Sequence, residues 1–237
     1  MSTLIRAELT KLRTVRSTWA VLLVLPLVAF ITLLDAVLDP VDHNTSVVDF
    51  MDISLAVAAI TLAAFAAALV ATEFTRRMVG LDYLTVPSRT PVLSAKLAAF
   101  ACVGAALGLF AALIAHPIST LIASGRGVPA DSPGTVALRV IAVTLVIAVL
   151  GAIGAALGVL IPQPAVAVGA VIGWQFVEGI LGMAFGITDY LPIGLITTVA
   201  HLGGTVALPV AVAFLCLYTA VAASAAMLVA KRRDLTG

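Results

Sequence analysis

Six long stretches of the chain are almost purely apolar, and charges or prolines separate them. They lie between Arg16 and Asp35, at 53–72, from Thr90 and Pro91 to about 118, at 140–161, from 165 to about 188, and from about 209 to 230. A helix needs roughly 20 apolar residues to cross the ~30 Å hydrocarbon core of a bilayer. Six uninterrupted runs of this length disfavour a large soluble core. The pattern therefore predicts an all-α membrane protein with six transmembrane helices.

Prolines mark several of the predicted helix ends. Thr90 followed by Pro91 predicts a helix start, because Thr is a good N-cap and Pro fits the first helical position. We expect Pro117 to bend or end the third helix. Pro162 and Pro164, in the sequence IPQPA, predict a tight turn between the fourth and fifth helices.

The composition supports a membrane location. The 237 residues are 62% hydrophobic and 11% charged, whereas soluble proteins carry about 25% charged residues. No small-residue cleavage site follows the first apolar run, so we expect that run to remain as a span rather than be removed as a signal peptide. Cys102 and Cys216 lie inside apolar runs and are expected to be small buried hydrophobes. We interpret residues 1–237 as a single transmembrane domain.

The charges are divided between the two sides that six helices would create. One side would hold both termini, the 71–96 connection and the IPQPA turn. Its basic residues are Arg6, Lys11, Arg13, Arg16, Arg76, Arg77, Arg89, Lys96, Lys231, Arg232 and Arg233. The other side would hold two basic residues and a set of aspartates, namely Arg126, Arg139, Asp35, Asp39, Asp42, Asp49, Asp52, Asp131 and Asp189. Because Lys and Arg in short loops mark the cytoplasmic side, both termini are predicted to be cytoplasmic.

The connection between the second and third apolar runs combines charged and apolar residues. Glu73 is three and four residues before Arg76 and Arg77, a spacing that allows an ion pair along a helix. The positive-inside rule accounts for about half of the charge. The apolar residues that follow have no role in a purely solvated loop; they are Met78, Leu81, Tyr83, Leu84 and Val86. They fit either a lipid surface or a groove on another protein.

Three motifs resemble the permease subunits of ABC-2-type exporters, especially the six-span kind found in actinobacteria. They are the basic N-terminal LIRAELTKLRTVRSTWAVLL, the connection TEFTRRMVGLDYLTVPSRTPVLSAK, and WQFVEGILG followed by DYLP. The resemblance covers essentially the whole chain. It departs from the family at 78–82, where relatives more often carry a Gly-Thr-[Ile/Leu]-Arg-like run.

The resemblance implies a cytoplasmic coupling segment at 73–89 that docks on a separate ATP-binding subunit. The residues it assigns to this contact are Glu73, Arg76, Arg77, Met78, Leu81, Asp82, Tyr83, Leu84 and Arg89. It also implies a bacterial plasma membrane location and a second permease copy or a paralogue as partner. ATP and magnesium would be bound by the partner ATPase, with no cofactor in this chain.

The chain lacks sequence signatures of catalysis. It has no G-x-x-x-x-G-K-[ST], H-E-x-x-H or G-x-S-x-G motif. The three histidines are far apart in sequence and show no metal-ligand spacing. We therefore predict neither an enzyme active site nor a metal site, and no nucleic-acid partner.

Glu178 is expected near the middle of the fifth span, where an ionised carboxylate is costly unless it is paired or wetted. Two interpretations stay open: a pathway or coupling residue, and a protonated or hydrogen-bonded residue that locks helices together. Trp174 and Gln175 are candidates to share its polar environment. The external connection 187–207 is expected either to re-enter the membrane or to lie on its surface.

The N-terminal segment 1–17 is predicted to be an interfacial amphipathic helix. The apolar residues Ile5, Leu9, Leu12 and, just beyond the segment, Trp19 lie roughly on one side. The basic residues that would reach lipid phosphates are Arg6, Lys11, Arg13 and Arg16. Glycine pairs at four-residue spacing predict close helix packing within the bundle, with a dimer face as the alternative; they are Gly104/Gly108, Gly154/Gly158, Gly169/Gly173 and Gly182/Gly186.

Together these features predict the membrane-spanning permease of an ATP-driven exporter. The alternatives are a non-transporting membrane anchor or regulatory subunit, and a secondary transporter, which would carry more intramembrane ionisable residues and inverted repeats. The sequence leaves drug, peptide and lipid substrates open.

Overall fold

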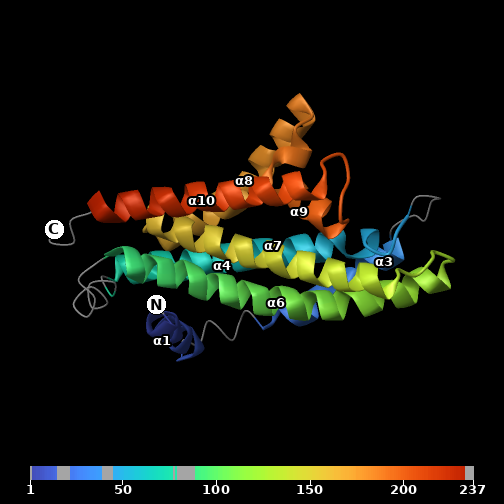
Figure 1. Ribbon diagram of the computed structural model, residues 1–237, viewed down its shortest axis with the longest axis horizontal. Helices are drawn as coiled ribbons and strands as arrows, with labels where there is room; N and C mark the ends of the chain where they lie inside the picture. The colour runs from blue at the N-terminus through green and yellow to red at the C-terminus, as the bar shows by residue number, and fades with distance from the viewer. Residues whose placement is uncertain (1, 15–21, 39–44, 77, 79–88, 233–237) are drawn as a thin grey trace.

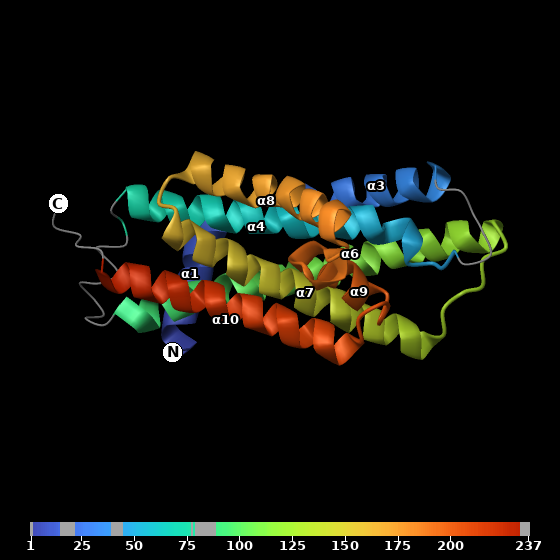
Figure 2. The same ribbon diagram turned by 90° about the horizontal axis from the view of Figure 1, so that it is seen from above.

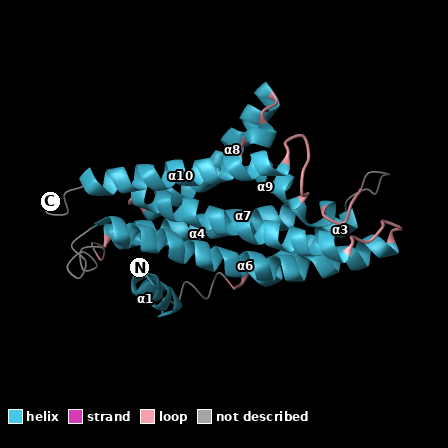
Figure 3. Cartoon of the chain, viewed as in Figure 1, coloured by secondary structure: helices cyan, strands magenta, loops and turns pink. Residues whose placement is uncertain are grey.

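The structure, a computed structural model, describes residues 2–14, 22–38, 45–76, 78 and 89–232. These residues form a bundle of α-helices, and no strand occurs among them (Figure 3). The α-helices are α1 Ser2–Thr14, α3 Val24–Leu38, α4 Asp52–Thr75, α6 Arg89–Gly125, α7 Pro133–Leu160, α8 Pro164–Phe185, α9 Pro192–Ala200 and α10 Leu208–Arg232. Two single-turn 3₁₀-helices, η1 Asp49–Met51 and η2 Thr188–Tyr190, precede α4 and α9.

Five of these helices are long and apolar enough to cross a membrane: α4 together with η1, α6, α7, α8 and α10. The helix α3 is also apolar but has 15 described residues, and 15–21 before it lie outside the described part. The chain is thus an all-helical protein with the character of a multi-pass membrane protein.

Proline and glycine set the ends of several helices. Ser132 is the N-cap of α7, where its side-chain oxygen accepts a hydrogen bond from the Thr135 N–H, and Pro133 follows at the first helical position. Gly186 ends α8 in the left-handed region at φ +65°, which glycine adopts without steric cost. Of the two effects predicted for Pro117, an end of the helix is wrong, because α6 continues through this proline to Gly125; a bend at Pro117 stays a prediction.

Two other predicted helix ends, at Asp35 and at Arg139, are also wrong. Asp35 lies within α3 and Arg139 within α7, and both side chains are buried. Arg139 forms an ion pair with Asp131. A charge that is paired inside the protein does not have to end an apolar helix, and a sequence pattern cannot show the pairing.

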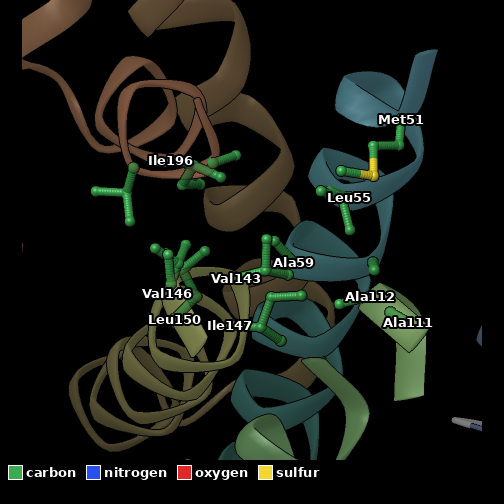
Figure 4. Close-up of a cluster of buried hydrophobic side chains, with 14 of the residues drawn as sticks. Met51, Leu55, Ala59, Ala111, Ala112, Val143, Val146, Ile147, Leu150 and Ile196 are labelled. Carbon is green, nitrogen blue, oxygen red and sulfur yellow. The ribbon is translucent and has the colours of Figure 1, made fainter. Parts of the chain in front are cut away.

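The core lies where α4, α6 and α7 pack together, with α3, α9 and α10 around them. Figure 4 shows Leu55 and Ala59 of α4 beside Val143 and Ile147 of α7, with Ile196 of α9 closing the same cluster. All five side chains are almost fully buried.

Glycines allow this close approach. A Cβ added to Gly158 of α7 would lie 2.5 Å from the Ala67 carbonyl oxygen of α4, and one added to Gly104 of α6 would lie 2.6 Å from the Ile147 carbonyl oxygen of α7. These glycines pack within one bundle, as predicted. The pair Gly169/Gly173 differs, because no described atom lies within 4 Å of either added Cβ.

The helices α8 and α10 lie at the edge of the bundle and expose apolar side chains. In α8, Phe176, Ile180 and Met183 are largely exposed, and Figure 1 shows this helix projecting from the bundle. Cys102 and Cys216 are also exposed and free, so their predicted burial is wrong. In a bundle with an apolar exterior, a residue in an apolar run has no need to face inward.

The two ends of the bundle carry different charges. One end, called the basic end, holds α1, the end of α4, the start of α6 and the end of α10 (Figures 1 and 2). The opposite end, called the acidic end, holds η1, the end of α6 and the start of α7. Each end contains a cluster of charged side chains from different helices.

Candidate functional site

The cluster at the basic end is centred on Lys96. This lysine lies in α6 and is only 1% exposed. Its Nζ lies 3.0 Å from both carboxylate oxygens of Glu8 in α1, and it also forms an ion pair with Glu73 in α4. Lys11 lies 3.1 Å from the same Glu8. The cluster, called the lysine clasp, therefore joins three helices through one buried cation.

The lysine clasp gives Glu73 a partner that helix spacing did not suggest. Sequence spacing pointed to Arg76 or Arg77, whereas Glu73 pairs with Lys96, 23 residues away. Arg76 is the C-cap residue of α4 and is exposed, and Arg77 lies outside the described residues. Because the contact between helices buries the Lys96 ammonium, this cation requires a carboxylate partner more than an exposed arginine does.

The predicted coupling residues are described only at their flanks. Met78 is exposed, and Arg89 is the first residue of α6. The rest of the predicted contact lies outside the described residues; it comprises Arg77, Leu81, Asp82, Tyr83 and Leu84. The flanks themselves are firmly held, since Thr75 donates a 2.6 Å hydrogen bond to the Pro162 carbonyl in the turn between α7 and α8.

The N-terminal helix packs against the bundle rather than standing apart. Leu12 is buried in a cluster with Leu93 and Phe100 of α6, and Leu9 packs against the same cluster. Arg6 and Arg13 are exposed on the other side, while Arg16 lies outside the described residues. The apolar side of α1 thus meets protein, and its arginines remain free to contact a surrounding surface.

Glu178 joins α8 to the short helix α9. Its side chain is 2% exposed. One carboxylate oxygen accepts a 2.9 Å bond from the Trp174 indole N–H, and the other accepts bonds of 2.6 and 3.2 Å from the N–H groups of Ile193 and Gly194. These two amides belong to the first turn of α9, where the backbone N–H groups have no acceptors within the helix itself. A carboxylate there also interacts favourably with the helix dipole.

These bonds match the helix-locking interpretation of Glu178. A role of this residue in transport stays a prediction. Gln175, its expected polar neighbour, lines an apolar cavity of about 360 Å³. No hydrogen bond between Gln175 and Glu178 is seen among the described residues. Residues of α4, α7, α8, α9 and α10 line this cavity, and Trp174, which bonds to Glu178, is one of them.

The cluster at the acidic end is centred on His201, which directly follows α9. Its Nε2 lies 2.8 Å from Asp52 Oδ2 and 3.7 Å from Asp49 Oδ1. Asp49 Oδ2 accepts bonds of 2.5 and 2.9 Å from the N–H and hydroxyl of Ser46. The hydrogen bond with Asp52 raises the pKa of His201 above its ordinary value, with the charges of both aspartates adding to this and burial opposing it.

A second charged pair lies close to this cluster. Arg139, buried in α7, forms an ion pair with Asp131, and its Nε donates a 3.1 Å hydrogen bond to the Ala200 carbonyl. Ala200 is the last residue of α9, so Arg139 also stabilises the helix end that precedes His201.

Sequence reasoning missed both clusters as units. His201 and Asp52 are 149 positions apart, and Lys96 and Glu8 are 88 apart. One signal was available in the sequence. These charged residues stand at the borders of apolar runs that already have membrane length without them. Neither the protein-family models nor the curated proteins compared with the chain give a match.

Proposed function

We propose that this chain is the permease subunit of an ABC-2-type exporter, with six spans and with α3 as part of the first. The lysine clasp is the observation that carries the proposal. It fixes α1, the end of α4 and the start of α6 to one another through Lys96, Glu8 and Glu73. These are the two flanks of the 73–89 segment and the helix beside it, so a force applied to the segment reaches three helices together.

Transmission to the rest of the bundle follows from packing. Both α4 and α6 pack closely on α7 through glycine contacts. Close-packed helices move as bodies rather than deform. Movement of a docked ATPase would therefore shift α4, α6 and α7 together relative to the less buried helices α8 and α10.

Charge supports a cytoplasmic position for the basic end. Its described helix ends carry Arg76, Lys231 and Arg232, and α1 adds exposed Arg6 and Arg13. The basic residues follow the positive-inside rule if this end faces the cytoplasm. Both termini and the proposed ATPase contact would then lie on the side where ATP is present.

The exposed apolar faces support a second permease copy or a paralogue as partner. A six-span subunit has too few helices to enclose a wide path alone, and α8 exposes a row of large apolar side chains. The cavity between α8 and α10 is almost wholly apolar, which favours apolar or amphiphilic cargo among the open substrate classes.

The test is reconstitution of the chain in liposomes with a candidate P-loop ATPase encoded beside it. We expect the two to copurify and the permease to stimulate ATP hydrolysis. Replacing Met78, Leu81, Tyr83 and Leu84 together by Ser should abolish association, because it removes the apolar side chains expected to fill the ATPase groove.

The matched control removes exposed apolar side chains from the acidic end. Leu121→Ser with Leu138→Ser should leave association unchanged, since both residues lie far from the 73–89 flanks. Association that survives the quadruple replacement contradicts the coupling contact. Transport that runs on an ion gradient without ATP would instead favour a secondary transporter.

A further inference from the structure

Three side chains at the acidic end form a set of possible metal ligands. Asp49 belongs to η1, Asp52 begins α4, and His201 follows α9. One ligand atom from each lies within 4.8 Å of the other two. The described chain thus brings two carboxylates and one imidazole together from segments that are about 150 residues apart in sequence.

The charges of this set are not balanced within it. Asp49 and Asp52 carry two negative charges, and a neutral His201 carries none. Arg139 is a cation whose charge acts on His201, and it is already engaged by Asp131 and the Ala200 carbonyl. The two carboxylates therefore carry negative charge that one imidazole does not neutralise, and an added cation would neutralise it.

One carboxylate oxygen also lacks a partner. Asp52 Oδ1 is shielded from solvent and has no hydrogen-bond donor among the described residues. A buried acceptor without a donor is costly. The opposite oxygen, Oδ2, is the one that meets His201, so only one of the two Asp52 carboxylate oxygens has a partner among the described residues.

The orientation of Asp49 is set by a neighbour. Ser46 holds Asp49 Oδ2 through both its N–H and its hydroxyl, which leaves Oδ1 toward His201. Hydrogen bonds of this kind, behind the metal-binding atom, orient ligands in known metal sites.

We propose that Asp49, Asp52 and His201 bind a divalent transition-metal ion of the Zn²⁺ type. One imidazole and two carboxylates form a nitrogen–oxygen ligand set that suits Zn²⁺, with a fourth position left for water. Bonds of about 2.0–2.2 Å around a tetrahedral ion place ligand atoms roughly 3.3 Å apart. The separations from His201 to Asp52 and Asp49, 2.8 and 3.7 Å, bracket that value, and all three ligand atoms lie within 4.8 Å of one another.

A bound ion would join the start of α4 to the connection between α9 and α10. The other end of α9 is already held by Glu178. The ion would therefore fix α9 at both ends. The proposal stands on the acidic end alone and does not depend on the transport function.

The test uses the purified full-length protein in detergent, freed of its purification tag and treated with EDTA. Calorimetric titration with ZnCl₂ should show one saturable equivalent, whereas MgCl₂ and CaCl₂ should give none of comparable affinity. ZnCl₂ should also raise the Tm of the wild-type protein. Absence of saturable zinc binding by the wild-type protein overturns the proposal without any variant.

Variants then locate the ion. His201→Gln and Asp52→Asn should each weaken zinc binding at least ~10-fold and remove the Tm rise, and Ser46→Ala should weaken it by about 10-fold through Asp49. His116→Gln and Asp189→Asn are matched controls, because neither residue belongs to the ligand set, and they should bind zinc like the wild type. Wild-type affinity in folded Asp52→Asn or His201→Gln contradicts the assignment.

Discussion

The two ends of the bundle use similar side chains in opposite proportions. At the basic end, one lysine lies between two glutamates, and a second lysine balances the remaining charge: Lys96 and Lys11 against Glu8 and Glu73. The central cation is 1% exposed. Every charge in this cluster is therefore met by another charge of the same chain.

At the acidic end, one titratable imidazole lies between two carboxylates. His201, Asp49 and Asp52 are each about one-third exposed, and their negative charge exceeds the positive charge they share. The difference teaches that a balanced, buried cluster acts as a fixed joint between helices. An unbalanced, partly exposed cluster has negative charge left over, which the proposed ion would meet from outside the chain.

The strongest test of this contrast is Lys96→Met. The change leaves two glutamates facing each other without their cation, and breaking such a buried pair costs about 3–5 kcal/mol. We expect a loss of that size in the free energy of unfolding, measured by denaturant titration in detergent. The exposed Arg232, changed to Met, should alter it by less than about 0.5 kcal/mol. Equal effects of the two changes would show that the lysine clasp is not a structural joint.

Glu178→Leu tests how far order at the acidic end depends on α9, the helix that precedes His201. The change leaves the Ile193 and Gly194 amides and the Trp174 N–H without their acceptor, at a cost of about 3 kcal/mol. Glu178→Gln keeps one carbonyl acceptor and should cost about 1 kcal/mol. Unfolding titrations of both variants measure the difference, and a Leu variant as stable as the Gln variant contradicts the capping role.

Gly158→Ala tests the packing that connects the lysine clasp to the middle of the bundle. The added methyl would lie 2.5 Å from the Ala67 carbonyl of α4, and overpacking of this kind costs about 1–3 kcal/mol. Gly169→Ala is the matched control on α8, where no described neighbour lies within 4 Å. It should be neutral or slightly stabilising, by up to about 1 kcal/mol. Equal unfolding curves for the two variants would contradict the tight α4–α7 contact.

The smallest effect is expected from His201→Gln in metal-free protein. The imidazole makes one half-exposed hydrogen bond to Asp52, and such a bond contributes about 1 kcal/mol. Thermal unfolding after EDTA treatment measures the change. A loss as large as that of Lys96→Met would mean that the acidic end is as fixed as the basic end, and the contrast between them would fail.

Much of the helical architecture could be predicted from the sequence, because membrane-length apolar runs are a strong local signal. The helices α4, α8 and α10 lie close to their predicted positions. The errors have a common origin. Asp35 and Arg139 were predicted as helix ends and Pro117 as a bend or an end, yet each lies inside a helix.

The candidate sites were less predictable than the helices. Glu178 was identified from its position in an apolar run, but its partners Ile193 and Gly194 are backbone groups that no side-chain pattern reveals. The lysine clasp and the His201 cluster depend on contacts between distant segments. Such contacts arise from helix packing, which a single sequence specifies only indirectly.

The length of α6 has a consequence for where water begins. Its 37 residues make a rod of about 55 Å at 1.5 Å per residue, well beyond the ~30 Å of hydrocarbon. The twenty residues of α6 that follow the charged Lys96, enough to cross the hydrocarbon, end at His116, and Pro117 is the next residue. Pro117 would then lie at the lipid–water boundary, where water can donate a hydrogen bond to the backbone carbonyl that proline leaves without a donor. The final two turns of α6 would project beyond the hydrocarbon, and there they pack against Phe50 of η1, the short helix that also carries Asp49.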